Sequence, residues 1–191
     1  MSFTFSQNDK VKYASAKFAL NFIKDGMKIG LGTGSTASWF VVLLGDLIQL
    51  KGINISSVST SKFTKKLAES VGIEVLNLDE LITLDLTVDG TDEFDDKLNL
   101  IKGGGGALLQ EKIVASASSE MIVIADESKC VDKLGKFPLP VEVVPFGVQS
   151  TKALIDHLLY SLDYSEALGE IRSKNNNVFI TDEGNNIIDY K

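Results

Sequence analysis

The sequence has little of several features that define whole classes of protein. It contains one cysteine, Cys130, and a lone thiol cannot form an internal disulfide, which argues against a small secreted scaffold. No apolar run reaches the length needed to span a bilayer. Residues 1–5 lack the basic region and apolar core of a signal peptide. We therefore expect a cytoplasmic protein with no membrane partner.

The sequence also has fewer basic than acidic residues. Nineteen lysines and arginines stand against 26 aspartates and glutamates, which gives a formal net charge of −7. An acidic protein gains little from counterion release, so we expect no nucleic-acid partner. Small anionic substrates are not excluded, because a local cluster of amides and lysines can hold a phosphate. The length of 191 residues and the hydrophobic fraction of 44% fit one globular domain, or one domain with a small appendage.

Expected strands and helices alternate through residue 126. A capping box, Ser6 to Asp9, opens the first helix. The further expected strands are 27–31, 53–59, 73–76, 84–88 and 121–125, and the further helices are 37–50, 62–71 and 107–117. This alternation predicts an α/β fold, a Rossmann-like parallel sheet with helices on both faces. Ligands bind such sheets at the carboxyl ends of the strands, where residues 32–36, 89–96 and 126–129 would lie.

The regular alternation of expected strands and helices does not continue in the same way after Lys136. Pro138 and Pro140 mark a break, and the elements expected beyond them are a strand at 141–144, a helix at 148–160 and strands at 178–181 and 186–190. Residues 182–185 would form the hairpin turn between the last two strands. This order is an incomplete split βαβ unit, a partial small ferredoxin-like α+β domain. We predict a catalytic domain over 1–132 and the partial small domain over 133–191.

Residues 30–36, Gly-Leu-Gly-Thr-Gly-Ser-Thr, stand between an expected strand and an expected helix. Glycines let the backbone approach a ligand, and the helix start adds its dipole and free amides. Ser35 occupies the place of the third glycine of the dinucleotide fingerprint, and no Gly-Lys-Ser/Thr of a P-loop follows. The pattern favours a phosphate site, although a tight turn without a ligand uses glycines too.

Residues 89–96 carry four aspartates and one glutamate after an expected buried strand. Asp89, Asp92 and Asp95 could be metal ligands, but the EF-hand spacing is absent. A phosphatase of the haloacid dehalogenase type needs a nucleophilic aspartate where Thr87 stands. Sugar binding fits as well, because carboxylates accept hydrogen bonds from hydroxyls and assist proton movement. The bland alternative is a solvated acidic turn.

Four consecutive glycines, Gly103 to Gly106, have no preference for helix or strand and cost backbone entropy on folding. Close approach to a ligand would offset that cost. Lys102 precedes the run, and Glu111 lies early in the expected helix that follows. A lysine near a glutamate suits carbonyl polarisation and proton abstraction. A flexible loop with a surface Glu–Lys pair is the competing interpretation.

Taken together, these segments resemble the ribose-5-phosphate isomerase A family. The matching segments follow the family's order and cover the chain from residue 9 onward. They are GLGTGST (30–36), VDGTDE (88–93), IKGGGGALLQEKIVA (101–115), IADESK (124–129), KLGKFPLPVEVVP (133–145) and VFITDEGNNIID (178–189).

The resemblance implies a reaction and a set of partners. The reaction is interconversion of ribose 5-phosphate and ribulose 5-phosphate, an aldose–ketose isomerisation through an enediolate in the non-oxidative branch of the pentose phosphate pathway. The resemblance implies no metal and no cofactor. It also implies a homodimer or a dimer of dimers whose partner is a small sugar phosphate.

The resemblance also assigns the site. By position, Glu111 matches the family's catalytic base, and Lys102, Asp89 and Asp92 match its other catalytic residues. The substrate-binding positions that it implies are Thr33, Gly34, Ser35, Thr36, Asp89, Gly90, Thr91, Asp92, Lys102, Gly103, Gly104, Gly105, Lys129 and Lys12.

The sequence departs from the family pattern in two places. Leu109-Gln110 stands where many members have Thr-Arg or Thr-Gln. Family chains also continue past the match to Asp189 with a helix, a strand and a final segment, whereas this sequence ends at Lys191. The catalytic positions are all present.

Two other functions compete with the isomerase. A sugar-phosphate sensor, as in sugar-responsive repressors, would need a DNA-binding module, and the sequence has no basic helix-turn-helix segment. Such a sensor would not need Glu111 and Lys102 together. An amino-sugar phosphate isomerase-deaminase is disfavoured by the segment KGGGGALLQEK.

Some conspicuous residues are expected to be structural. His157 lies on an expected helix outside the matched segments. Cys130 has no histidine nearby in sequence and is predicted to be a packed thiol. Trp39 and Phe40 follow the glycine loop on an apolar helix and are predicted to lie in the core.

Overall fold

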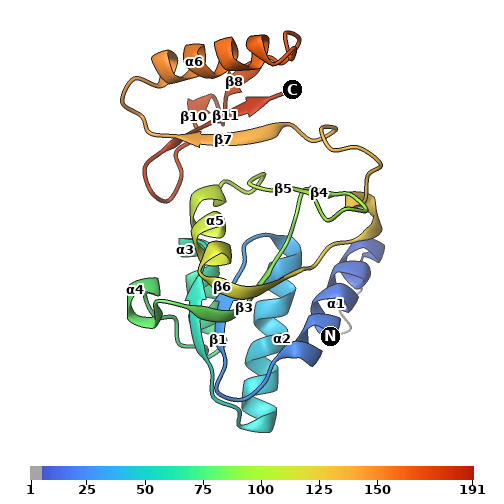
Figure 1. Ribbon diagram of the computed structural model, residues 1–191. Helices are drawn as coiled ribbons and strands as arrows, with labels where there is room; N and C mark the ends of the chain where they lie inside the picture. Colours follow the sequence, from blue (N-terminus) through green and yellow to red (C-terminus); the bar gives the residue numbers. More distant parts are fainter. Residues whose placement is uncertain (1–5) are drawn as a thin grey trace. The chain divides into compact units, whose positions relative to one another are not determined.

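The computed structural model describes residues 6–191 and is drawn in Figure 1; the predicted absence of a signal peptide concerns residues 1–5, which lie outside that part. By its internal contacts the chain divides into two units. The first unit is Met1–Thr91 with Leu109–Lys129, and the second is Asp92–Leu108 with Cys130–Lys191. No pattern in the sequence indicates that residues 92–108 belong to the second unit. A division into domains at 132 and 133 remains a prediction.

A four-stranded parallel sheet organises the first unit, as predicted. Its order is β2-β1-β3-β6. The strands are β1 (Lys28–Leu31), β2 (Ser56–Ser59), β3 (Leu84–Asp89) and β6 (Ser118–Val123). The strand predicted at 73–76 is wrong, because that segment contributes only a single bridge between Val75 and Ser57. A segment that meets the sheet at one residue has no ladder of hydrogen bonds to extend it.

The helices of this unit are α1 (Gln7–Ala19), α2 (Ser35–Lys51), α3 (Lys62–Ser70), α4 (Leu78–Leu81) and α5 (Leu108–Ser116), with the short 3₁₀ turns η1 (Leu20–Phe22) and η2 (Glu127–Lys129). Helices α1, α2, α3 and α5 lie at nearly the predicted positions, whereas α4 and the two 3₁₀ turns were not predicted. The Ser6 hydroxyl accepts the Asp9 N–H at 3.1 Å and caps α1, as the sequence predicts. Gly52 ends α2 in the left-handed conformation at a φ of 64°.

Helices cover both faces of this sheet. Helices α1 and α2 lie on one face (Figure 1). There, Ile29 and Leu31 of β1 pack with Ala16 of α1 and with Phe40 and Leu44 of α2, all of them buried. Phe40 therefore lies in the core, as predicted. Burial of each large apolar side chain contributes roughly 1.5–3 kcal/mol, so this face supplies much of the first unit's stability.

The opposite face receives α5 at close range. A Cβ on Gly30 would lie 2.1 Å from the Thr87 hydroxyl oxygen and 2.7 Å from a methyl group of Val114 on α5. Only a residue without a side chain lets the helix approach β1 this closely. The close approach matters for function, because α5 carries Glu111.

The second unit contains a short hairpin and a three-stranded antiparallel sheet. The hairpin pairs β4 (Glu93–Phe94) with β5 (Leu100–Ile101). The sheet has the order β7-β11-β8 and is made from β7 (Leu139–Val143), β8 (Gly169–Ile171) and β11 (Asn186–Tyr190). Helix α6 (Val148–Ser161) packs Ile155 and Leu159 against buried Ile188 and Tyr190.

The predicted hairpin around residues 182–185 is wrong. Residues 182–185 do lie in a turn, because the Gly184 N–H donates to the Thr181 carbonyl at 3.0 Å. The strand before that turn is missing, however. The antiparallel pair lies earlier, between β9 (Ser173–Lys174) and β10 (Asn177–Val178). Asn175 and Asn176 between them both have positive φ, 53° and 62°, which suits a two-residue hairpin turn.

Tyr190 provides a test of packing in the second unit. Burial raises its pKa to about 12, and its hydrogen bond to Asp156, at 3.0 Å, adds to the rise. A hydrogen bond from Lys152 to Asp156 lowers the pKa of that carboxyl. Because the pKa of Tyr190 is higher in the folded state, its contribution to stability is fully present below about pH 10 and is lost as the pH rises through 12.

We expect an alkaline absorbance titration of the wild type to contain a phenolate step near pH 12 that is absent from Tyr190→Phe. The wild type should also lose its stability advantage over this variant as that step is completed. If the step lost in Tyr190→Phe lay instead at the ordinary tyrosine pKa of about 10, the burial of Tyr190 would be contradicted.

Two predictions about single residues have different outcomes. The interpretation of Cys130 as a packed thiol is wrong, because the residue is exposed. Its backbone makes one parallel bridge to Phe94, and its side chain adds nothing to a core. Trp39 is half-buried and meets the ring of Tyr13 edge to face, with 5.7 Å between the ring centres.

Candidate active site

The sheet of the first unit has a switch point between β1 and β3. The chain leaves β1 toward β2 on one side and leaves β3 toward β6 on the other side. The loops that follow β1 and β3 therefore start at neighbouring carboxyl ends and run in opposite directions. Parallel sheets bind ligands in the crevice at such a point. Residues 32–34 follow β1 and residues 90–91 follow β3, so the topology brings both predicted loops to one edge.

Asp89, the last residue of β3, ties these two loops together. Its Oδ1 accepts the N–H of Thr33 at 3.0 Å and that of Gly90 at 2.7 Å, and the side chain is fully buried. The Gly32 N–H donates to the Val88 carbonyl at 2.9 Å. A Cβ on Gly32 would lie 2.1 Å from Asp89 Oδ1, so glycine is required where the two loops meet.

A cluster of buried hydroxyl groups fixes the loop from below. The Thr33 hydroxyl lies 2.7 Å from that of Thr60, 2.8 Å from that of Ser61 and 3.1 Å from that of Thr64. Thr64 also donates to the Gly32 carbonyl at 3.0 Å. The hydroxyl of Thr33 and its N–H thus both bond within the protein, and the donors that face outward here come from the residues after it.

Thr60, Ser61 and Thr64 are not among the residues predicted from the sequence. The available signal was local: Ser61 caps α3 by accepting the Thr64 N–H at 3.1 Å, which is a common pattern at helix starts. That pattern predicts a cap and does not predict a contact with a loop 28 residues away.

Lys12 lies at the start of α2, and Lys129 lies close enough to Asp126 to act on the same carboxyl group as Lys12. Lys12 Nζ donates to the Ser35 hydroxyl at 2.9 Å, which brings the first helix to the glycine loop. The hydrogen bond from Ser128 lowers the pKa of Asp126, and the positive charges of Lys129 and Lys12 lower it further. One carboxylate therefore feels both lysines. Free amides at a helix start with two cations nearby form an anion-binding arrangement.

Glu111 lies in the first turn of α5 and is only 4% exposed. Glutamate is rarely buried to this extent, and buried carboxyl groups concentrate at functional sites. Its neighbour Lys112 is exposed, which is the ordinary state of a charged residue on a helix. The burial of Glu111 marks it as the candidate base within the first unit.

The second unit holds the glycine run and two predicted catalytic residues. Asp92 Oδ2 accepts the N–H of Gly104 at 2.7 Å, so this carboxylate sets the path of the run. Lys102 lies directly between β5 and the glycines. Gly103 and Gly106 have φ values of 97° and 84°, a region that other residues rarely adopt.

The other carboxylates of the acidic loop hold backbone groups. Glu93 is 4% exposed and accepts the N–H groups of Gly135, at 2.8 Å, and Phe137, at 2.5 Å. Asp95 accepts hydrogen bonds from Asn99, which lower the pKa of Asp95. Within residues 6–191, no three histidine, cysteine, aspartate or glutamate side chains gather as metal ligands would.

Thr87 occupies the place of a phosphatase nucleophile and is fully buried in the sheet. Its hydroxyl lies 2.6 Å from that of Ser118. A side chain committed to packing between two strands cannot attack a phosphate ester.

A family profile decides which of the predicted functions to keep. The profile of "Ribose 5-phosphate isomerase A (phosphoriboisomerase A)" matches residues 56–191. The chain belongs to the ribose 5-phosphate isomerase A family. Curated ribose-5-phosphate isomerases A agree with this. The protein of Ruegeria pomeroyi is 56% identical over 181 residues, which are 95% of this chain and 69% of that protein. The protein of Jannaschia sp. is 54% identical over 189 residues, 99% of this chain and 72% of that one.

Solved structures of the ribose 5-phosphate isomerase A family share the fold. One described in complex with phospho-erythronic acid has a TM-score of 0.87 and 42% identity, over 97% of this chain and 80% of that one. The ribose 5-phosphate isomerase of Plasmodium falciparum has a TM-score of 0.88 and 38% identity, over 95% of this chain and 78% of that one. These likenesses confirm the fold class predicted from the sequence.

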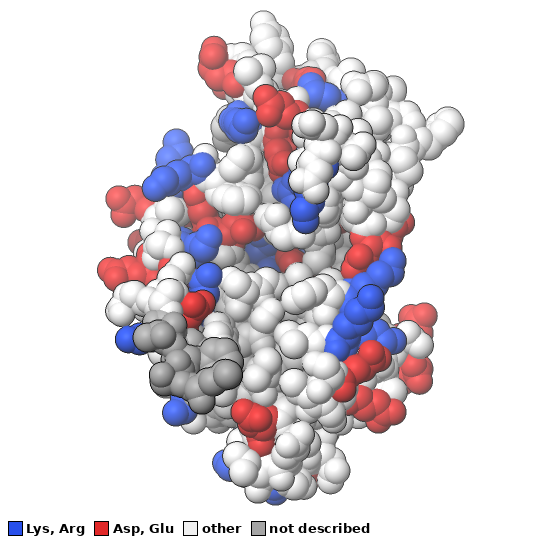
Figure 2. All heavy atoms as spheres, turned by 180° about the vertical axis from the view of Figure 1, so that it is seen from behind, with Lys and Arg blue, Asp and Glu red and all other residues white. Residues whose placement is uncertain are grey.

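The face of the molecule drawn in Figure 2 is mixed in charge. Basic and acidic side chains of the described residues lie intermingled on the face drawn in Figure 2, and neither sign covers an extended area. Among the described helices, none is long and apolar enough to cross a membrane.

Proposed function

We propose that this chain interconverts ribose 5-phosphate and ribulose 5-phosphate through an enediolate, with Glu111 as the base. The observation that carries the proposal is the buried carboxylate of Glu111, placed in the first turn of the helix that directly follows the glycine run. A base for carbon acids needs to be shielded from water and held in place, because proton transfer requires a fixed geometry.

The reaction needs one proton to move between carbons. In the open-chain aldose, the Glu111 carboxylate takes the proton from C2, and the C2 electrons form a C1=C2 bond as O1 becomes negative. The O2 proton is then transferred to O1. Glu111 returns its proton to C1, and C2 becomes the ketone carbon. A single carboxyl group serves both carbons, so atoms and electrons balance without a cofactor.

Lys102 and Asp89 are assigned to the oxygens in this proposal. Lys102 and N–H groups of the glycine run stabilise the negative oxygen of the enediolate, which can contribute roughly 3–4 kcal/mol per donor. Asp89 assists ring opening by moving the O1 proton. Its Oδ1 already accepts two backbone N–H groups, so the carboxylate is held rigidly for this task. Asp92 is assigned a supporting role, because it accepts the Gly104 N–H.

The phosphate end is assigned to the start of α2. Gly34, Ser35 and Thr36 offer amides and hydroxyls there, and Lys12 and Lys129 offer positive charge. A solved relative, 42% identical, holds phospho-erythronic acid, a phosphorylated sugar acid. Such a molecule joins a phosphate to a carboxylate, whose spread negative charge resembles that of an enediolate.

The proposal is tested by conversion of ribose 5-phosphate to ribulose 5-phosphate by the purified chain, with a metal chelator present. We expect the rate of conversion to be the same with and without the chelator. The conversion is monitored by NMR of the sugar carbons. In deuterated water, the C1 position of the ketose should gain solvent deuterium whenever the proton on the base exchanges. Absence of turnover in a folded sample, or turnover abolished by the chelator, would contradict the proposed mechanism.

Lys12 gives a prediction about binding. Lys12→Met removes the charge beside Ser35, and loss of a charged hydrogen bond should raise KM for ribose 5-phosphate about 10-fold. The effect on kcat should be smaller, because Lys12 is assigned to the phosphate and not to the reacting carbons. Lys10→Met, at an exposed position of the same helix, is the matched control and should leave KM unchanged. Equal values of KM for the two variants would remove Lys12 from the phosphate site.

We also infer a cytoplasmic homodimer or dimer of dimers. The family resemblance supports the assembly, and the lone thiol of Cys130 supports a reducing compartment. Light scattering after size-exclusion chromatography measures the assembly directly, and a monomeric mass would contradict it.

A further inference from the structure

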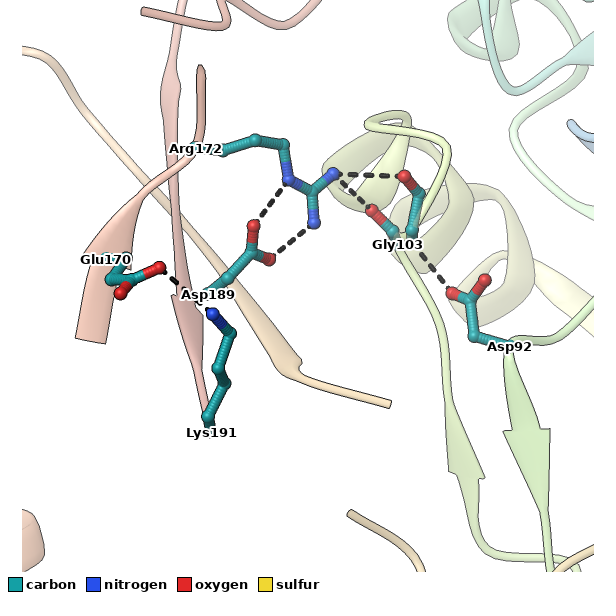
Figure 3. Close-up of polar contacts among 7 residues, drawn as sticks. Asp92, Gly103, Glu170, Arg172, Asp189 and Lys191 are labelled. Atoms are coloured by element: carbon teal, nitrogen blue, oxygen red, sulfur yellow. Dashed lines mark hydrogen bonds and ion pairs between the residues drawn. The ribbon is translucent and has the colours of Figure 1, made fainter. Parts of the chain in front are cut away.

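We propose that Arg172 is a positioning residue that sets the direction of the Gly105 N–H within the glycine run Gly103–Gly106. The inference rests on the proposed function, which assigns N–H donors of this run to the negative oxygen of the reacting sugar. All of the contacts concerned lie within the second unit, and Figure 3 shows them.

The Arg172 guanidinium is shared between one carboxylate and two backbone carbonyls. Its Nε and Nη2 donate to Asp189 on β11 at 2.8 and 2.5 Å. Its Nη1 donates to the carbonyl oxygens of Gly103 and Gly104 at 3.0 and 3.1 Å (Figure 3). The side chains of the ion pair are only 14% and 20% exposed. Such a two-pronged pair fixes the plane of the guanidinium, so its third nitrogen is aimed as well.

These contacts fix the orientation of two peptide groups, the one between Gly103 and Gly104 and the one between Gly104 and Gly105. The peptide that joins Gly103 to Gly104 is held at both ends, because Asp92 accepts its N–H at 2.7 Å and Arg172 binds its carbonyl. The next peptide is held by its carbonyl at Gly104. Since a peptide group is planar and trans, the N–H of Gly105 must point away from the guanidinium.

The Gly105 N–H is the donor that this arrangement presents. Gly105 is exposed, and within residues 6–191 its N–H donates to no other group of the protein. The positive charge on the Gly104 carbonyl polarises that peptide and makes its N–H a stronger donor. Arg172 therefore both orients and strengthens a hydrogen-bond donor without touching the sugar itself.

The glycine run needs such a device because glycine supplies no rigidity of its own. Phe179 supports the same segment: a Cβ on Gly106 would lie 2.4 Å from its ring, and the Arg172 guanidinium lies 5.9 Å from the centre of that ring. Asp92, Arg172 and Phe179 thus hold the run from three directions.

A second ion pair of the same sheet provides a matched control. Lys191 Nζ donates to Glu170 at 3.1 Å, with the side chains 61% and 69% exposed (Figure 3). It joins residues on or beside the same strands as the Arg172–Asp189 pair but contacts no glycine of the run. Loss of this pair therefore shows what a change at the edge of the same sheet does to turnover when no contact with the glycine run is lost.

The test compares Arg172→Met, Arg172→Lys and Lys191→Met in the full chain. Arg172→Met should lower kcat about 10- to 100-fold and change KM by less than about threefold, since a small misplacement of a catalytic donor has effects of this size. Arg172→Lys should regain part of kcat, because lysine can donate to a carbonyl but cannot bind Asp189 with two nitrogens. Lys191→Met should keep wild-type kcat. Urea unfolding confirms that each variant is folded.

A second readout does not depend on turnover. The NMR amide resonance of Gly105 should shift in Arg172→Met and in the milder Asp189→Asn, and should stay in place in Lys191→Met. An unchanged Gly105 resonance in folded Arg172→Met overturns the inference, and so does an unchanged kcat. If the wild type itself does not turn over ribose 5-phosphate, the proposed function fails while the amide measurement still decides the orientation of the run.

Discussion

Glu111→Gln is expected to abolish nearly all turnover of ribose 5-phosphate while leaving the chain folded. Glutamine has the same shape as glutamate and can occupy the same buried place in α5, but its amide cannot take the proton from C2. General-base catalysis contributes about 100- to 10,000-fold, so kcat should fall by a factor in that range. KM should change little, because the phosphate end is held elsewhere.

The experiment pairs this variant with Lys112→Gln, which removes a charge at the next, exposed position of the same helix. Lys112→Gln should keep wild-type kcat. Thermal unfolding of both variants checks that the helix is intact. Turnover within about tenfold of wild type in a folded Glu111→Gln sample would exclude Glu111 as the base, since the loss of a base costs more than this.

Gly32→Ala is expected to have the largest effect on stability together with a loss of activity. The added Cβ would lie 2.1 Å from Asp89 Oδ1 and 2.5 Å from Asp89 Cα. Real contacts of this kind do not occur, so the loop and β3 must separate, and overpacking of this sort costs about 3 kcal/mol. Separation also breaks the hydrogen bond from Thr33 to Asp89, and turnover should fall about 100-fold.

Gly90→Ala serves as the control for the stability measurement. The nearest atoms to a Cβ at this position lie 3.9 Å away, which is ordinary contact. Urea unfolding should therefore place Gly90→Ala within about 1 kcal/mol of wild type. Comparable stabilities for Gly32→Ala and Gly90→Ala would show that the meeting of the two loops is looser than the structure has it.

The sheet and helices of the first unit could be predicted because their signals are local. The alternation of expected strands and helices and the Ser6 cap of α1 each depend on residues close in sequence. Where the signal was ambiguous, the prediction failed. The segment 182–185 has the composition of a hairpin turn, but Asn175-Asn176 forms the observed one, and two consecutive residues of positive φ cannot be read from composition alone.

In the candidate site, too, the local sequence patterns could be predicted and the long-range contacts could not. The glycine loop and the glycine run can be recognised in the sequence. Glycine is needed in both because some of their residues have positive φ. The resemblance added the roles of Glu111 and Lys102. The residues that hold the loops in place were missed: Thr64 reaches Gly32 across 32 positions and Arg172 reaches Gly104 across 68. Contacts at such separations follow from tertiary packing, which no local pattern encodes.

Whether Cys130 is buried could not be predicted from its residue type either. A small apolar side chain is most often buried, so the sequence favoured a packed thiol. Cys130 is the first residue of the second unit after η2, and its side chain is exposed there. Position relative to a unit boundary is a property of the whole fold.

The interleaving of the two units along the chain has a consequence for how the protein comes to be made. The first unit has all of its residues once Lys129 has been synthesised, whereas residues 92–108 emerge early and must wait for the strands that follow residue 130. Because chains fold from the N-terminus during synthesis, the first unit can form its sheet while the hairpin of β4 and β5 is still without its partners. A gene cut at residue 130 would separate the glycine run from Arg172, so the second unit cannot be expressed as one uninterrupted fragment.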